Sequence, residues 1–422
     1  MIGVDMPLEP IVVGREPKEL AKFGTKGTVY LGKHVVGTGF ESHMTNPVQM
    51  DMARPHVVLI VGKRGSGKSY SAAVLAEEVM LQPAEIRDQL SVVMIDTMGI
   101  FWSMKEPNDP ALMLLKEWEL EPKSFPVQNV VPHGLADFYK RQSIAFDTTF
   151  AVKPNELSAG DWALTFGVSI FEPLGILLER TIRSLQGKEY SIGDIIKAIE
   201  ADKRAEEKDK AALANRFAGA EGWGIFAKEA TPIEKFLKPG IATILDVSMQ
   251  DWPVRNLTVG LLARKLYSIR LAARREEEEA TIAGEVVRKV PLTWLMMDEA
   301  HNFLPAEGET AATGALLTLL RQGRQPGIST VFITQRPLKL HEDAIAQADM
   351  VIAHRLTAQP DLAALSTVMQ SYALEDIRKL VTELPKQPGS AVLLDDNSER
   401  LFAIQVRPRM SWHAGGTPSA LR

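Results

Sequence analysis

Residues 56–81 read HVVLIVGKRGSGKSYSAAVLAEEVML, and this stretch decides the fold of the 422-residue chain. Its first part, 56–61, is an apolar run typical of a strand buried in a parallel sheet. Its last part, 68–81, has the apolar spacing of a helix. Between them lies a loop of the form G-x-x-x-x-G-K-S, whose glycines let the backbone turn its N–H groups toward phosphate oxygens. Strand, loop and helix in this order are the context that a phosphate-binding loop requires.

The residues of this loop have separate expected roles. Lys68 is expected to reach the β- and γ-phosphates of a nucleotide, and the Ser69 hydroxyl to ligate Mg²⁺. The first turn of the helix adds the positive end of its dipole. We therefore predict ATP and Mg²⁺ as cofactors, bound by Gly62, Lys63, Arg64, Gly65, Ser66, Gly67, Lys68, Ser69 and Tyr70.

A phosphate-binding loop needs an acidic partner on another strand, and residues 291–299, PLTWLMMDE, supply one. The apolar run predicts a strand that ends in two acids at the carboxyl edge of the sheet, where open α/β sheets bind ligands. Asp298 is expected to hold Mg²⁺ through its water shell. Glu299 is expected to orient and deprotonate the attacking water, which favours hydrolysis over binding alone.

The remaining apolar runs predict an α/β fold with a doubly wound, mainly parallel sheet. Expected strands are 91–96, 241–247, 328–334 and 350–353, expected helices are 254–275, 310–322 and 360–369, and 390–394 and 401–406 read as closing antiparallel strands around a turn. Lys68 and Asp298 are 230 positions apart, about twice what a plain nucleotide-binding core needs, so we predict an insertion. The predicted division is an N-terminal segment 1–55, a core of 56–109 and 233–422, and an inserted helical domain 110–232.

The amino-acid composition excludes several kinds of function. There are 48 basic and 53 acidic residues, a net charge of −5, so any DNA binding must come from a local patch. The absence of cysteine excludes disulfides, thiol catalysis and cysteine zinc sites. The N-terminus has no secretory signal pattern, and the apolar stretch 162–178 is interrupted by Glu172 and Pro173. We predict that this stretch is a buried helix and that the protein is cytoplasmic, with no membrane partner.

Two further residues are candidates for the reaction. Gln335 follows the strand 328–334, beside the acidic pair, where its amide could contact the γ-phosphate and the attacking water. Arg324 lies at the end of the expected helix 310–322. We expect it to be too far from the nucleotide of its own subunit to contact it. It could act on a neighbour's nucleotide in a ring, as an arginine finger, or serve only as a cation at a helix C-terminus.

Together these segments resemble the HerA branch of the FtsK/HerA hexameric ATPases. The resemblance implies a RecA-like core, a homo-hexamer that encircles and translocates double-stranded DNA, an arginine-finger role for Arg324, and a helical bundle on one face of the ring. Family members usually carry an N-terminal β-barrel, and we expect it to be reduced or lost here. The resemblance rests on 62–69, 152–157, 237–248, 298–303, 323–324, 334–337 and 406–416.

Other functions remain open at this point. A ring-shaped regulatory ATPase that activates a separate effector, such as a nuclease in defence against phage, would show the same motifs. A coupling ATPase for secretion would usually show a membrane segment. Residues 298–301 read DEAH, which is also a motif of two-lobed RNA helicases. Those proteins need a second lobe, so we reject this interpretation. His301 is therefore expected to be a local structural or interface residue.

Overall fold

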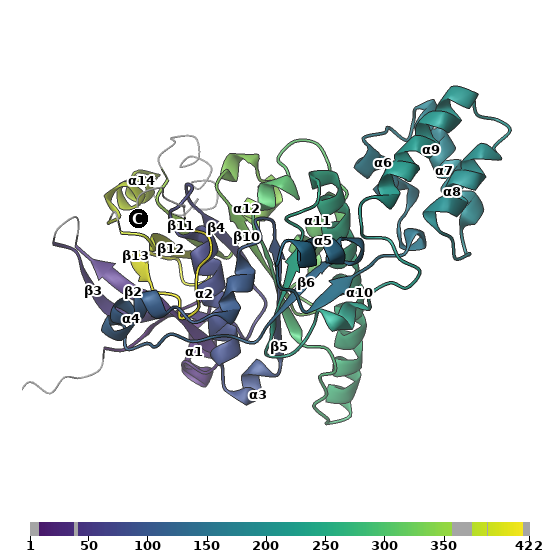
Figure 1. The fold of residues 1–422 in the computed structure, drawn as a ribbon. Helices are drawn as coiled ribbons and strands as arrows, with labels where there is room; N and C mark the ends of the chain where they lie inside the picture. The colour runs from purple at the N-terminus through teal and green to yellow at the C-terminus, as the bar shows by residue number, and fades with distance from the viewer. Residues whose placement is uncertain (1–7, 38–40, 357–373, 386, 417–422) are drawn as a thin grey trace, which may run out of the picture.

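A single 13-stranded sheet forms the centre of the molecule in the computed structural model, which describes residues 8–37, 41–356, 374–385 and 387–416 (Figure 1). The strand order is β1-β3-β2-β13-β12-β11-β4-β10-β9-β5-β8-β6-β7. The strands are β1 Ile11–Val13, β2 Thr28–Val36, β3 His43–Asp51, β4 Val57–Val61, β5 Leu90–Asp96, β6 Val127–Pro132, β7 Thr148–Phe150, β8 Ala242–Asp246, β9 Leu292–Met297, β10 Ile328–Thr334, β11 Met350–His354, β12 Ser390–Asp395 and β13 Arg400–Val406.

The strands from β11 to β7 in this order are all parallel, whereas β12, β13 and β2 join by antiparallel pairing. In register, Thr334 of β10 lies beside Val61 of β4, and Phe332 lies beside Met297 of β9. The carboxyl ends of these three strands therefore meet at one edge. The α/β fold with a mainly parallel sheet is confirmed, and the predicted neighbours β9 and β10 are adjacent.

The sheet is buried on both faces, which explains its continuous apolar runs. In β4, Val57, Leu59 and Val61 point into one hydrophobic core, and Val58 and Ile60 into the other. The first core also contains helices α10 to α12, and the second contains the phosphate-loop helix α2. Helices therefore cover both faces of the sheet.

The helices divide between these layers and a projecting bundle (Figure 1). They are α1 Pro17–Phe23, α2 Lys68–Leu81, α3 Ala84–Arg87, α4 Leu112–Glu117, α5 Ala136–Arg141, α6 Ala159–Phe166, α7 Pro173–Leu185, α8 Ile192–Glu200, α9 Glu207–Glu221, α10 Trp252–Ile282, α11 Thr313–Gln322, α12 Glu342–Ala346 and α14 Leu374–Glu383.

The predicted helical insertion 110–232 is wrong in its boundaries. β6 and β7 lie inside it, and both belong to the central sheet, where β6 pairs with β8. Only α6 to α9 form the bundle that stands away from the sheet (Figure 1). Its centre is Trp162, which is fully buried and packs its ring against Phe166 and Phe217.

Two helix predictions need correction, and a third is not tested by the described residues. The apolar stretch 162–178 is not one helix. Helix α6 ends at Phe166 and is followed by Gly167, whose backbone is in the left-handed conformation, and α7 starts at Pro173. The helix expected at 254–275 runs on to Ile282, and the helix expected at 360–369 lies outside the described residues. Within the part of the chain that is described, no helix has both the length and the apolar character needed to cross a membrane.

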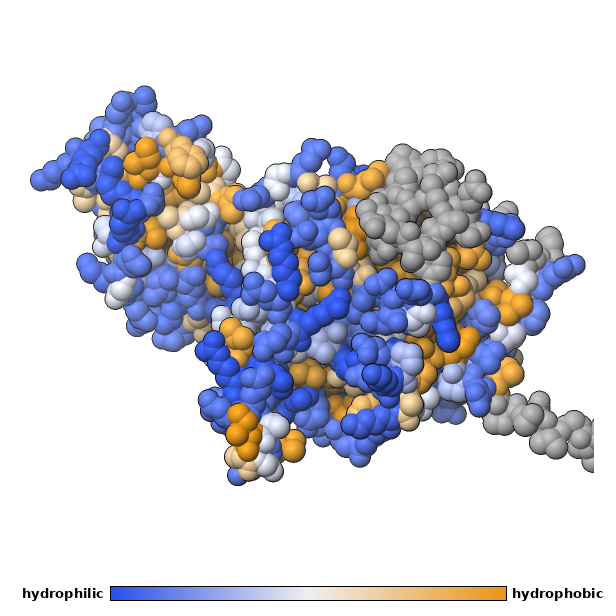
Figure 2. Space-filling model, turned by 180° about the vertical axis from the view of Figure 1, so that it is seen from behind, coloured by the Kyte–Doolittle hydropathy of each residue, from blue (hydrophilic) through white to orange (hydrophobic). Residues whose placement is uncertain are grey.

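The N-terminal segment adds strands to the sheet of the core. β2 pairs with β13, β3 with β2, and β1 with β3, so the described part of 1–55 extends the central sheet. Seen from behind, the surface is mostly hydrophilic, with apolar side chains gathered on part of the projecting bundle (Figure 2). Phe171, at the turn between α6 and α7, is the most exposed large apolar residue of that bundle, at 85%.

Candidate active site

The phosphate-loop motif folds into a tight turn between β4 and α2. Gly62, Gly65 and Gly67 all have positive φ angles, of 156°, 76° and 114°. A Cβ on Gly62 would lie 2.7 Å from the Cβ of His354, so this position has no room for a side chain. The loop therefore needs its glycines, and it presents the first N–H groups of α2 to a common point.

Lys68, the first residue of α2, is held over this loop. Its ammonium group donates a hydrogen bond to the carbonyl of Lys63 at 3.1 Å, and the residue is only 8% exposed. Burial lowers its pKa, and the charges of Asp298 and Glu299 act in the opposite direction. An ammonium has three donors, and the structure records one of them in use, so Lys68 can bind phosphate without moving far.

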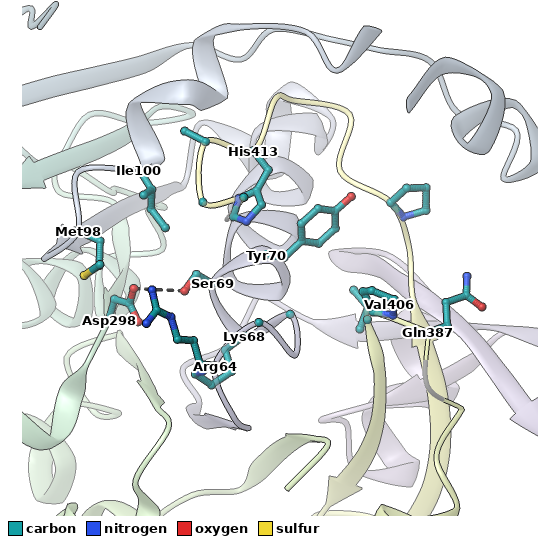
Figure 3. Close-up of a pocket in the computed structure, with 18 of the residues that line it drawn as sticks. Arg64, Lys68, Ser69, Tyr70, Met98, Ile100, Asp298, Gln387, Val406 and His413 are labelled. Carbon is teal, nitrogen blue, oxygen red and sulfur yellow. Dashed lines mark hydrogen bonds between the residues drawn. The ribbon is translucent and has the colours of Figure 1, made fainter. Parts of the chain in front are cut away.

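The acidic strand β9 brings Asp298 to the start of α2. The hydroxyl of Ser69 donates to Asp298 Oδ2 at 3.2 Å, which joins residues 229 positions apart (Figure 3). Asp298 is 3% exposed, and burial raises its pKa, while its own hydrogen bonds and Lys68 act to lower it. A hydroxyl and a carboxylate are hard oxygen ligands of the kind that Mg²⁺ accepts beside phosphates and water. The residues present therefore fit this ion.

Glu299 has a left-handed backbone, with φ of 51°, which is uncommon for a residue with a Cβ. Its carboxylate accepts a hydrogen bond from Gln335 Nε2 at 3.3 Å. Burial first, and then the charge of Asp298, raise the pKa of Glu299. A backbone strained by about 1–3 kcal/mol is typical of functional sites, and here it aims the acid at Gln335 beside the phosphate loop.

His301 lies beside this acid. Its Nδ1 is 3.5 Å from Glu299 Oε2 and 2.9 Å from the hydroxyl of Thr334. Burial, together with the charges of Arg336 and Lys68, lowers the pKa of His301 to about 4. It is therefore a neutral imidazole at pH 7 that supports the position of Glu299.

A cavity of about 970 Å³ lies over these groups. Arg64 and the acidic pair line it on one side, and Tyr70 lies beside His413 on another side (Figure 3). Its other wall comes from the end of the described chain, in the segments 387–389, 405–408 and 413–416. The predicted loop residues Lys63 and Ser66 bond to each other, with Ser66 Oγ donating to the Lys63 carbonyl at 2.8 Å.

Arg324 does not line this cavity. It follows α11 and precedes β10, so it lies at the amino edge of the sheet. One guanidinium nitrogen donates to the carbonyl of Gln347 at 2.9 Å and lies 3.7 Å from Asp349. Its side chain is 46% exposed. Of the four residues predicted for the reaction, the structure brings Lys68, Glu299 and Gln335 together and leaves Arg324 apart.

Several site residues were not predicted from the sequence. His354 is buried beneath the loop, 2.9 Å from the hydroxyl of Ser71, and burial lowers its pKa to about 4. His413 lines the cavity. The sequence does carry a signal for His354, because a polar ring at the end of the apolar strand β11 is unusual unless it has a specific partner. No pattern in the sequence indicates that residues 413–416 fold back over the loop.

Comparison with known proteins identifies the family of this chain. Residues 30–266, more than half of the chain, match the family described as the central domain of helicase HerA. The DNA double-strand break repair helicase HerA of Pyrococcus furiosus is 26% identical over 165 residues, which cover 35% of this chain and 28% of that protein. A probable HerA of Methanocaldococcus jannaschii is 25% identical over 145 residues, 31% of this chain and 29% of its own length.

Two solved structures share the fold. VirB4 of Thermoanaerobacter pseudethanolicus has a TM-score of 0.55 at 14% identity, over 91% of this chain and 97% of that one. The bacterial conjugative coupling protein TrwB, lacking 70 N-terminal residues, has a TM-score of 0.52 at 13% identity, over 94% and 98%. The family match, the phosphate loop and the paired acids agree, and the chain belongs to the family of the HerA central domain, among the P-loop NTPases.

Proposed function

We propose that this protein is an ATP-hydrolysing motor that assembles as a homo-hexamer, encircles double-stranded DNA and translocates it, in DNA processing or repair. The observation that carries the proposal is the meeting of two contacts in one cavity. Ser69 bonds to Asp298, and Glu299 bonds to Gln335. The first pair fits nucleotide and metal binding, and the second fits activation of a water.

The proposed reaction follows from what these side chains can do. The N–H groups of the loop and Lys68 bind the β- and γ-phosphates. Ser69 and Asp298 would hold Mg²⁺, which neutralises phosphate charge when it is bound. Glu299 accepts a proton from the attacking water, and the amide of Gln335 holds that carboxylate in place and can contact the γ-phosphate.

The motor proposal assigns Arg324 to the next subunit's site. Its place at the amino edge and its half-exposed guanidinium support a contact in trans, because it cannot complete the cavity of its own chain. An arginine supplied by a neighbour would stabilise the charge that develops on the transferred phosphoryl group. Hydrolysis would then require assembly.

DNA is proposed as the substrate from the names of the HerA relatives. A ring that moves along any duplex must grip phosphates without reading bases, so binding should weaken steeply as salt rises. A nuclease or another effector would act as a partner of such a ring.

The test is ATP-dependent displacement of a third strand from a labelled duplex. Wild-type protein should displace it with ATP, and Glu299→Gln should not. Duplex binding should fall when the salt concentration is raised. Hydrolysis of ATP without duplex binding or displacement would overturn the motor and favour a regulatory ring that activates a separate effector, for instance in defence against phage.

A further inference from the structure

We infer that Tyr70 and His413 form a base-binding subsite that recognises purine nucleoside triphosphates by stacking and discriminates little between adenine and guanine. This inference rests on the proposed function, because it concerns the same cavity. It adds a second recognition region to the phosphate loop, built from the last described segment of the chain.

The subsite is fixed to the phosphate-loop helix by a buried carboxylate. Glu77 of α2 has no exposed surface and accepts hydrogen bonds from the guanidinium of Arg407, the backbone of Met410, and both the backbone and the hydroxyl of Ser411. Arg409, also fully buried, is 3.6 Å from the same carboxylate. The segment 407–411 is therefore attached to α2, and His413 follows two residues later.

The two rings meet at the upper wall of the cavity. Their centroids are 5.4 Å apart and nearly perpendicular, and both residues line the cavity (Figure 3). Arg409 holds both, since its backbone N–H donates to the Tyr70 hydroxyl at 2.5 Å and its guanidinium contacts His413 Nδ1 at 3.0 Å. Rings held in this way offer a preorganised surface to a flat ligand.

The charge state of these rings suits a base and not a phosphate. Burial, and then the charge of Arg409, lower the pKa of His413 to about 4, so it is neutral at pH 7. Because an arginine only donates, the Nδ1 that it contacts is the acceptor, and the proton of the neutral ring is on Nε2. A neutral ring has no charge with which to attract the phosphates.

The lining of this part of the cavity explains the expected tolerance between purines. The side chains that line the cavity include the apolar Ile100, Leu114 and Trp118. Gln405 also lines the cavity, but its oxygen accepts from Ser390 and its nitrogen donates to the Pro388 carbonyl. A wall that is mostly apolar cannot strongly reject a ligand that differs only in polar substituents. The larger stacking area of purines should still favour them over pyrimidines.

The experiment compares His413→Ala with wild type in the binding of ATP, GTP, CTP, UTP and inorganic tripolyphosphate. Stacking on one aromatic ring predicts that His413→Ala weakens ATP and GTP by about tenfold and leaves tripolyphosphate unchanged. His413→Phe, which keeps a ring, should restore most of the purine affinity. Trp412→Ala is the matched control, because this neighbouring ring is 40% exposed and is not among the cavity-lining residues.

Each outcome has a distinct meaning. Equal weakening of ATP and tripolyphosphate in His413→Ala, unchanged ATP binding in that variant, or pyrimidine binding as tight as purine binding would each overturn the subsite. If wild-type protein binds neither ATP nor tripolyphosphate, the proposed ATPase itself fails. If wild type binds both and only the His413 effect is missing, the ATPase survives and the subsite alone is rejected.

Discussion

The charged residues at the amino edge of the central sheet are paired with one another, whereas those at the carboxyl edge face a cavity. At the amino edge, His56 lies 2.9 Å from one oxygen of Asp349 and 3.8 Å from Asp51, and Asp51 also contacts Arg15. At the carboxyl edge, Asp298 and Glu299 face a cavity, and the recorded partner of the Lys68 ammonium is a carbonyl. The paired edge stabilises the fold, and the open edge is where a charged ligand fits.

Arg324 is the exception at the amino edge. It lies 3.7 Å from Asp349, yet its side chain is nearly half exposed, unlike the buried His56 and Asp51. On the proposed function, incomplete pairing, more than charge itself, distinguishes the groups that we expect to act on ligands from those that we expect to stabilise the fold. Changes at the open edge should cost activity, and changes at the paired edge should cost stability.

Lys68→Ala should have the largest effect. It removes the cation at the phosphate loop, so ATP binding should weaken and turnover should fall by at least about 10³-fold. The melting temperature should not drop, because the lost hydrogen bond joins only Lys68 to a nearby carbonyl. Turnover and binding of a fluorescent ATP analogue measure the effect, and normal turnover would remove the assigned site.

Glu299→Gln should lower turnover by on the order of 10³-fold while ATP still binds. The amide keeps the shape of the side chain but cannot accept the proton of water. Single-turnover hydrolysis and nucleotide retention separate the two steps. Glu307→Gln, the same change at an exposed position nearby, is the control, and wild-type hydrolysis in Glu299→Gln would place the base elsewhere.

Asp349→Asn should show the opposite pattern at the amino edge. It weakens the buried pair with His56 and should cost about 3 kcal/mol of stability, because the imidazole loses the nearer of its two anionic partners. Binding of ATP should persist, since Asp349 is remote from the loop. A calorimetric melt beside a nucleotide titration checks both, and lost ATP binding with unchanged melting would contradict the division between the edges.

The smallest expected effect is a pH dependence of stability from His56. Burial alone would lower its pKa, but Asp349 and Asp51 outweigh burial and raise it above 6.5. The folded state thus holds this proton more tightly than the unfolded state. Its stabilisation is fully present below pH 6.5 and is lost as pH rises through the raised pKa.

Melting temperatures between pH 6 and pH 9 measure this loss. His56→Gln should show a smaller decline over that range than wild type, because it has no proton to lose there. An equal decline in both proteins would mean that His56 does not titrate as the geometry implies.

The sequence predicts the parts of the fold that depend on local patterns. The apolar runs place β4, β5 and β8 to β13, and the phosphate-loop motif and the acidic pair identify residues that meet in space. These predictions succeed because a strand buried on both faces must be apolar throughout. They also succeed because the positive φ angles of the phosphate loop require glycine at three positions.

What the sequence could not predict depends on distant contacts. β6 contains Gln128 and Asn129, so its pattern does not read as a buried strand, although both are buried in the sheet. The return of the last described segment depends on Glu77 meeting Arg407 across 330 positions. Local propensity says nothing about such pairs, and the wall of the cavity around His413 was missed for that reason.

The central claim is that the open edge is completed by Arg324 from a neighbouring subunit. Arg324→Ala alone should lower turnover by on the order of 10³-fold or more while ATP still binds. The most direct measurement mixes Lys68→Ala subunits, which keep the arginine, with Arg324→Ala subunits, which keep the pocket. Mixed rings should regain partial ATPase activity, because some sites then hold both groups. If mixed assembly is confirmed and no activity returns, Arg324 serves only its own helix, and the claim is contradicted.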